Sequence, residues 1–326
     1  MKRIYMHYMS VKMKSFPCRT PVFLLRTSLF VFAFLILSST TAFSQKLQHK
    51  RDTSKGFDFF FNAGMYLGSK ANANYYRGWK NIESDYADPD INYVLNNQYW
   101  YRYILDAIDI TYNDVIADTF FLEGTSEMKY NMAFVFGIGA RYRFSENFML
   151  SFLFSQVRLT AEGIATLAIK GTGVNLDKGI KYIDYPLIGK ERRNFFEMNA
   201  AFLFNTASPY IYPFVELGVH VNSTKVLSSV LIVEEQSYSL INWHGEGTQL
   251  DPSITLPEID PHLGGIGYGF MGGFGVRLTF NKWAAIEPVV QINAEKVQLA
   301  GYNEMRPNFN FMVRLVVGDQ LFSKKQ

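Results

Sequence analysis

The chain has 326 residues, with 32 Lys and Arg against 29 Asp and Glu, and it is rich in aromatic residues, including 29 Phe and 20 Tyr. This balance argues against a nucleic-acid partner, because such proteins carry a clustered basic face. The single cysteine, Cys18, precedes the apolar run described next. If the segment that contains Cys18 is removed, the processed chain has no cysteine that could form a disulfide or carry a lipid anchor.

Residues 1–44 have the pattern of a cleaved export signal. A basic start leads into the apolar run SLFVFAFLIL, residues 28–37, and then into small residues at Ala42 and Ser44, so we expect cleavage near Ser44. The run is about half of the roughly 20 apolar residues that a spanning helix needs, which disfavours a membrane anchor. Without six basic residues of this segment, 26 basic residues face 29 acidic ones, a net charge of −3.

Eight segments of the processed chain alternate between apolar and polar or small residues, with the period of a β-strand. Each is long enough to supply the roughly 9 to 11 residues of a transmembrane strand. The segments are residues 56–69, 129–145, 147–161, 194–205, 210–223, 265–280, 283–298 and 307–318.

The two faces of these segments differ in chemistry. One face is uncharged and rich in aromatic and aliphatic residues, such as Phe57, Phe59 and Phe61, whereas the other alternates glycine with charged and amide residues. Aromatics outside and a glycine-rich polar interior favour a lipid-facing barrel over a soluble sandwich. The predicted ionic network of the interior is Asp58, Arg141, Arg143, Glu197, Glu216, Arg277, Glu287 and Arg314, with His220 and Glu295 on the same face.

The connections between segments alternate in length. Short turns follow the second, fourth and sixth segments, whereas the long stretches 70–128, 162–193 and 224–264 follow the first, third and fifth. Outer-membrane barrels have this asymmetry, with turns in the periplasm and loops outside the cell. Aromatic residues near the turns predict an interfacial girdle, and they are Tyr142, Phe144, Phe148, Tyr210, Tyr212 and Trp283.

We therefore predict an all-β fold, an eight-stranded antiparallel up-and-down transmembrane β-barrel with long extracellular loops. The predicted barrel covers residues 56–322, and residues 45–55 form a periplasmic N-terminal segment. A ten-stranded barrel is the alternative, if the first long loop adds two strands.

The eight-strand meander, the cleavage-site string AFSQ and the last strand FNFMVRLVV (residues 309–317) resemble the OmpA-like and OmpX-like small outer-membrane barrels. The outer membrane β-barrel domain proteins of Bacteroidota are the most similar group. This resemblance implies a location in the outer membrane of a Gram-negative bacterium, among its lipids. It also implies insertion by the barrel assembly machinery, which recognises the last strand. Here Phe322 is followed by Ser-Lys-Lys-Gln instead of ending the chain.

An eight-stranded barrel is just wide enough for its own side chains or one small ligand. Buried charges are costly unless they are paired, so we expect the interior charges to form ion pairs that close the lumen. The predicted role is then structural or surface-binding, carried by the extracellular loops. The alternatives are narrow-lumen transport of a small or apolar solute, or an outer-leaflet enzyme that modifies lipid or peptide.

The loops contain candidate recognition residues for an extracellular or envelope protein or a glycan. These are aromatic residues and one histidine: Tyr75, Tyr76, Trp79, Tyr99, Trp100, Trp243 and His244. Because an aromatic patch signals binding only when it is exposed, packing within the chain is the favoured alternative. The stretch INYVLNNQYWYRYILDAI is expected to form a short amphipathic helix or an extra strand.

Two polar loop clusters are weaker candidates for chemistry. Glu83, Asp85, Asp88 and Asp90 supply carboxylates but lack the glycine-centred spacing of a calcium loop, so a solvated acidic turn is favoured. His244, Glu246, Asp260 and His262 form no diagnostic metal or acid–base motif. We expect no catalytic site, metal or cofactor.

Overall fold

The computed structural model describes residues 55–78, 89–95, 97, 100, 103–104, 120–170, 180–208, 210–241, 263–281 and 283–318. These residues belong to one compact unit, His49–Gln326. The predicted export signal, its cleavage site and residues 45–54 lie outside the described residues.

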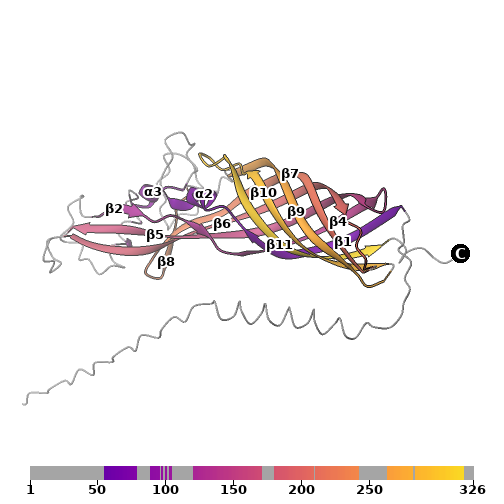
Figure 1. Ribbon diagram of the computed structural model, residues 1–326. Helices are drawn as coiled ribbons and strands as arrows, with labels where there is room; N and C mark the ends of the chain where they lie inside the picture. The colour runs from indigo at the N-terminus through magenta and orange to yellow at the C-terminus, as the bar shows by residue number, and fades with distance from the viewer. Residues whose placement is uncertain are drawn as a thin grey trace, which may run out of the picture. The chain divides into compact units, whose positions relative to one another are not determined.

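Eight long strands form a closed antiparallel ring (Figure 1). Each strand pairs with the long strand that follows it in the chain, and the first closes the ring by pairing with the last. The ring strands are β1 (Gly56–Leu67), β4 (Ala133–Arg143), β5 (Phe148–Lys170), β6 (Ile180–Leu203), β7 (Ile211–Val233), β9 (Gly264–Thr279), β10 (Ala284–Lys296) and β11 (Met305–Gly318). The predicted eight-stranded up-and-down barrel is confirmed.

Short elements fill the connections at one end of the ring. They are α2 (Lys70–Ala73), η1 (Asn74–Arg77), α3 (Ile91–Leu95), β2 (Phe120–Thr125), β3 (Lys129–Tyr130) and β8 (Gln236–Ser239). Strands β2 and β3 pair with the part of β5 that extends beyond β4. The first loop thus adds strands to an edge, and the ring stays eight-stranded. No helix in the described part of the chain is long and apolar enough to cross a membrane. 

An apolar belt surrounds the ring. On β6, Phe196 and Phe202 are both more than half exposed, whereas Glu197 and Ala201 between them are buried. The same alternation holds on β1, where the exposed Phe59 and Phe61 flank the buried Phe60. The outward faces are thus those that the sequence pattern predicts, because successive side chains of a strand point to opposite sides.

Aromatic rings stack at the short-turn end of the barrel. Ring centroids are 4.9 Å apart for Phe57 and Tyr142, 4.8 Å for Tyr142 and Phe144, and 4.9 Å for Phe148 and Phe202. The prediction for Tyr212 is wrong, because this side chain is buried inside the barrel. It alternates with the exposed Ile211, so strand geometry turns it inward.

Three strands run well beyond the bounds that the sequence predicts. Strand β5 continues to Lys170 instead of residue 161, β6 starts at Ile180 instead of 194, and β7 continues to Val233 instead of 223. The outer faces of these extensions are no longer continuously apolar, so the sequence pattern did not indicate strands there. The inner face continues to alternate, however, with Ala165, Leu167, Leu187 and other buried side chains.

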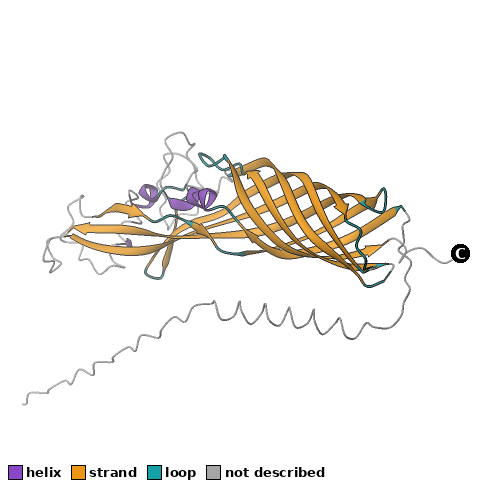
Figure 2. Cartoon of the chain, in the orientation of Figure 1, coloured by secondary structure: helices purple, strands orange, loops and turns teal. Residues whose placement is uncertain are grey.

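The extended parts of β5, β6 and β7 form an open sheet with β2, β3 and β8, and we call this sheet with α2, η1 and α3 the outer head (Figure 2). Buried apolar side chains of the sheet and the short helices form one core. Its members include Tyr75, Tyr76, Ile91, Val94, Ala165, Leu167, Leu187, Leu231, Val233 and Tyr238. The outer head is therefore a folded unit with its own hydrophobic core.

Candidate functional site

The barrel interior gathers charged side chains from strands far apart in the ring. At the short-turn end, Arg141 Nη2 lies 2.8 Å from Glu287 Oε1, joining β4 to β10. Asp58 on β1 lies within ion-pair distance of three guanidinium groups, with nitrogen–oxygen distances of 3.7 Å to Arg141, 3.3 Å to Arg143 and 3.6 Å to Arg277. Three cations and two carboxylates thus share one buried cluster.

A second ion pair crosses the middle of the lumen. Both terminal nitrogens of Arg314 on β11 donate to the carboxylate of Glu216 on β7, at 2.6 and 2.8 Å. Gln291 also donates to Glu216 at 2.7 Å, and Asn310 donates to Gln291 at 3.3 Å. The fork of an arginine matches a carboxylate in this two-bond geometry, which fixes both side chains.

A third cluster, which we call the junction cluster, lies where the barrel meets the outer head. Arg193 is fully buried and pairs with Glu191 at 2.6 Å and with Glu295 at 2.7 Å. The hydroxyl of Tyr66 donates to Glu295 at 2.5 Å, and that of Tyr130 donates to Glu191 at 3.0 Å. One cation therefore holds two carboxylates, with the phenols as additional donors.

Tyr76 connects the junction cluster to the outer head. It lies in η1, is fully buried, and donates from its hydroxyl to Glu191 Oε2 at 2.6 Å. Burial, and then the adjacent Glu191 carboxylate, hold the pKa of Tyr76 well above its usual value, so the phenol is a donor at physiological pH. Its ring packs against Gly189, where an added Cβ would lie only 2.1 Å from it. A glycine is needed there for η1 to approach the sheet.

Glu197 and His220 face each other between these clusters. They are paired residues of β6 and β7. His220 Nε2 lies 3.4 Å from Glu295 Oε2, and Glu197 contacts only Ser155 and Asn199 among the described hydrogen bonds, at 3.4 and 3.5 Å. The histidine ring lies against β9, where a Cβ on Gly269 would come within 2.6 Å of it.

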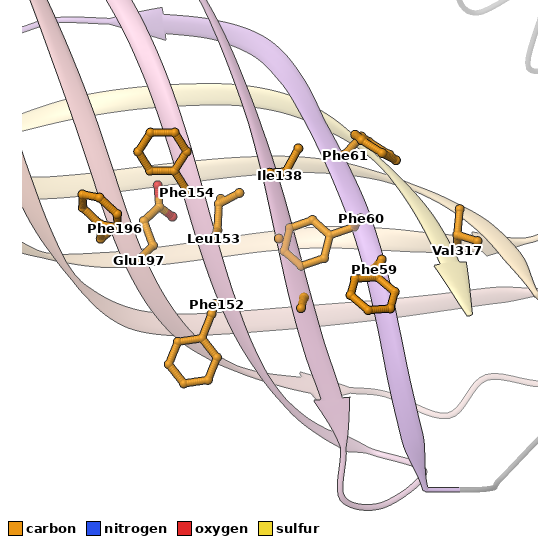
Figure 3. Close-up of a pocket in the computed structure, with 12 residues that line it drawn as sticks. Phe59, Phe60, Phe61, Ile138, Phe152, Leu153, Phe154, Phe196, Glu197 and Val317 are labelled. Carbon is orange, nitrogen blue, oxygen red and sulfur yellow. The ribbon is translucent and has the colours of Figure 1, made fainter. Parts of the chain in front are cut away.

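Apolar layers separate the charged groups, a feature that the predicted polar interior did not include. Phe60 is buried, and its ring lies 5.3 Å from the guanidinium carbon of Arg141 and 5.6 Å from that of Arg314. Figure 3 shows Phe60 between its outward neighbours Phe59 and Phe61. Those two border an apolar groove of about 890 Å³ that also includes Phe152, Phe154 and Phe196 of the belt.

The structure places the eight predicted network residues inside the barrel, with Arg143 and Arg277 less completely buried than the others. Seven of them form ion pairs, and Glu197 has no pair with an arginine or lysine among the described residues. The sequence prediction placed Glu295 on the inner face but missed Glu191 and Arg193, the other charged residues of the junction cluster. The alternation along β6 was the available signal. Glu191 and Arg193 are an even number of residues from Glu197, so they point to the same face of the strand.

The candidate recognition residues have a different outcome. Tyr75 and Tyr76 are buried in the outer head, and Trp100 packs on Tyr238 with ring centroids 6.0 Å apart. Packing within the chain, the favoured alternative, is confirmed for these residues. The other candidates, Trp79, Tyr99, Trp243 and His244, lie outside the described residues, as do Glu83, Asp85, Asp88, Glu246, Asp260 and His262.

Among the described residues, no group of three or more His, Cys, Asp or Glu side chains is arranged to hold a metal ion. No protein-family model and no curated protein matches the sequence. Two solved structures with similar folds are Neisserial surface protein A (TM-score 0.34, 10% identity, 80% of this chain and 96% of that chain) and the outer membrane protein OprG from Pseudomonas aeruginosa (TM-score 0.33, 9% identity, 82% and 97%). These values carry no argument about function.

Proposed function

We propose that the protein is an integral outer-membrane β-barrel whose lumen is closed and whose outer head has a structural or surface-binding role. The apolar belt around a closed ring carries this proposal. A closed ring satisfies the backbone hydrogen bonds of every strand, which lipid requires, and the exposed phenylalanines on six of the eight ring strands gain from contact with acyl chains. The short turns then face the periplasm and the outer head faces the outside.

The closed lumen is supported by ion pairs that cross it. Arg141 with Glu287, Glu216 with Arg314, and Arg193 with Glu295 each join strands that are three positions apart in the eight-stranded ring. Such strands lie on opposite sides of a narrow barrel. Opening the lumen would separate buried charges from their partners, which costs several kcal/mol for each pair.

The outer head supports the binding role. Its core is packed by residues of the first loop, so its outer surface is held by a stable unit. On that surface Tyr182 and Ile164 are exposed although they lie beyond the belt. A partner protein or glycan of the envelope or the cell exterior is the ligand class that this surface would bind. We propose no catalytic role.

Reconstitution tests the barrel and its lumen. Refolded into lipid vesicles, the protein should migrate differently in unheated and heated gel samples, and in planar bilayers it should give no stable large conductance. An Arg141→Ala/Glu287→Ala variant serves as a control that weakens the closure. A porin-sized conductance of the unmodified protein would refute the closed lumen. A folded, monodisperse protein in buffer without detergent would refute the membrane location.

The binding role is tested with solubilised outer membranes. A Tyr182→Ser/Ile164→Ser variant should lose a partner that the unmodified protein retains. Met132→Ser is the control, because Met132 is similarly exposed but lies in the connection between β3 and β4. Equal capture by all three proteins would exclude this surface as the binding site.

A further inference from the structure

Three cations lie side by side on the outside of β5, β6 and β7, just beyond the belt. Arg158 is paired directly with Arg192, and Arg192 directly with Lys225. Their chain neighbours, such as Val157, Arg193 and Val226, point inward and are buried, so the three cations share the outward face. We call these three residues the cationic row.

Like charges directly opposite each other destabilise a sheet, so the adjacent Arg158 and Arg192 need a compensating anion. Within the described part of the chain, no carboxylate forms an ion pair with Arg158 or Arg192. The Nε atom of Arg192 is buried and has no hydrogen-bond acceptor there.

The outward acids nearest along these strands make other contacts. Glu162 accepts a hydrogen bond from Asn131, and Asp184 accepts one from Thr166. Lys190, paired with Thr160 one row further from the belt, adds a fourth outward cation to the region. Arg158 and Arg192 therefore lie side by side among outward cations, with no ion-pair partner in the described part of the chain.

The register of the strands gives the depth of the cationic row. Phe154 and Phe196 form the last aromatic row of the belt on β5 and β6, with ring centroids 5.0 Å apart. The next row is polar, with Gln156 Nε2 donating to Asn194 Oδ1 at 2.7 Å. The cationic row follows, four residues from the aromatic row, or about 13 Å along a strand at roughly 3.3 Å per residue.

With the usual strand tilt, this separation is roughly 10 Å along the membrane normal. Acyl chains in contact with Phe154 and Phe196 would therefore have their headgroups at the level of the cationic row. The ligand must combine apolar chains with an anionic headgroup. Arginine guanidinium groups bind phosphate through paired hydrogen bonds, and two arginines side by side offer two such forks.

We propose that the cationic row binds the phosphate groups of a phosphorylated glycolipid in the outer leaflet, with the lipid chains on the adjacent belt. This proposal rests on the outer-membrane location proposed above. The row would hold such lipids at one sector of the barrel, next to the outer head. Because the attraction is electrostatic, binding should weaken as the salt concentration rises.

The test measures lipid binding to the purified full chain in a non-ionic detergent by native mass spectrometry. The probes are diphosphoryl lipid A, the same lipid after enzymatic dephosphorylation, and inorganic phosphate. The proteins are the unmodified chain, an Arg158→Gln/Arg192→Gln/Lys225→Gln variant and Lys129→Gln. Lys129 is an exposed cation two rows further from the belt, paired with Glu162, and so controls for loss of charge alone.

Each basic residue near an anionic lipid surface contributes about fivefold in affinity, so the triple variant should bind diphosphoryl lipid A roughly 100-fold more weakly. Lys129→Gln should bind almost as well as the unmodified chain. Equal binding by the triple variant, or equal binding of the dephosphorylated lipid, would overturn the proposal. Displacement of the lipid by a similar concentration of inorganic phosphate would also overturn it, in favour of a soluble anion.

A gel-shift assay in lipid vesicles separates this proposal from the one on which it rests. If the unmodified protein does not fold into vesicles, the proposed function fails. If all three proteins fold but lipid binding is independent of phosphate, only the cationic row fails as a lipid site. Arg158 and Lys225 are exposed and Arg192 is partly buried on the outer face, so the three substitutions should leave the barrel folded.

Discussion

The belt region and the outer head are built from the same three strands, yet their polarity is reversed. On β6 within the belt, Phe196 is exposed outside and Glu197 is buried inside. Further along the same strand, Lys190 is exposed outside and Leu187 is buried inside. One strand can therefore lie in two different environments, because its apolar side must face lipid in one region and a protein core in the other.

The apolar and polar faces of these strands exchange sides within a few residues. The hydrogen-bonded pair Gln156 and Asn194 marks the change on the outside, and the junction cluster around Arg193 marks it on the inside. Tyr76 and Tyr130 reach the cluster from the outer head, whereas Glu295 belongs to the barrel. The junction cluster thus couples the two regions, and its removal should give the largest effect.

Arg193→Met should destabilise the protein by about 3–5 kcal/mol, because Glu191 and Glu295 would remain buried without their cation. The measurement is urea unfolding in phosphatidylcholine vesicles, followed by tryptophan fluorescence. Adding Glu191→Gln and Glu295→Gln to this variant should restore most of the loss. Arg306→Met is the control, because that side chain is exposed. A loss below about 1 kcal/mol would contradict the central role of Arg193.

Leu231→Ala tests whether the outer head has its own core. Leu231 is fully buried in that core, so its truncation should cost about 2–5 kcal/mol. The loss should appear as faster proteolysis and hydrogen exchange in the outer head, while the heat-dependent gel shift of the barrel stays unchanged. Simultaneous loss of both regions would show that they unfold as one unit.

A charge placed on the outside of each region tests the reversal directly. Leu217→Arg, in the belt, should cost about 2–4 kcal/mol in vesicles, whereas Ile164→Arg, on the outer head, should change stability by less than about 0.5 kcal/mol. Both side chains are exposed, at 70% and 46%. Unfolding titrations of both variants give the difference, and equal costs would place the two residues in the same solvent.

The sequence is sufficient to predict the ring, because lipid on one side and a packed interior on the other impose alternation along every strand. It is insufficient for the extensions of β5, β6 and β7. There an outer residue such as Lys190 looks like a loop residue, and the inner Leu167 and Leu187 gain meaning only from the first loop that packs on them. That loop is distant in sequence, so no local pattern reports the contact.

Strand alternation predicts which side chains point into the barrel, but it does not predict which of them form ion pairs. Alternation places Arg141 and Glu287 inside, yet their contact depends on which strands face each other across the lumen. The recognition candidates in the first loop show the same limit. Tyr75 and Tyr76 are as aromatic as an exposed binding patch, and only the three-dimensional structure shows that they are buried.

Tyr76→Phe isolates the contact between the outer head and the barrel and should have the smallest effect among the substitutions expected to destabilise the protein. The change keeps the ring that packs on Gly189 and removes only the hydroxyl that donates to Glu191. Because Arg193 and Tyr130 still donate to Glu191, the loss should be near the lower end of the roughly 1.5–3 kcal/mol range for a hydrogen bond to a charged group.

Hydrogen exchange is the appropriate measurement, because it reports local opening of η1 while the barrel stays folded. Tyr238→Phe is the matched control, since the buried Tyr238 hydroxyl has no hydrogen-bond partner among the described residues. Faster exchange in η1 for Tyr76→Phe alone would mean that Glu191 holds the outer head onto the barrel. Equal exchange in the two variants would mean that apolar packing is sufficient, and the reversal of polarity would then need no polar connection between the two regions.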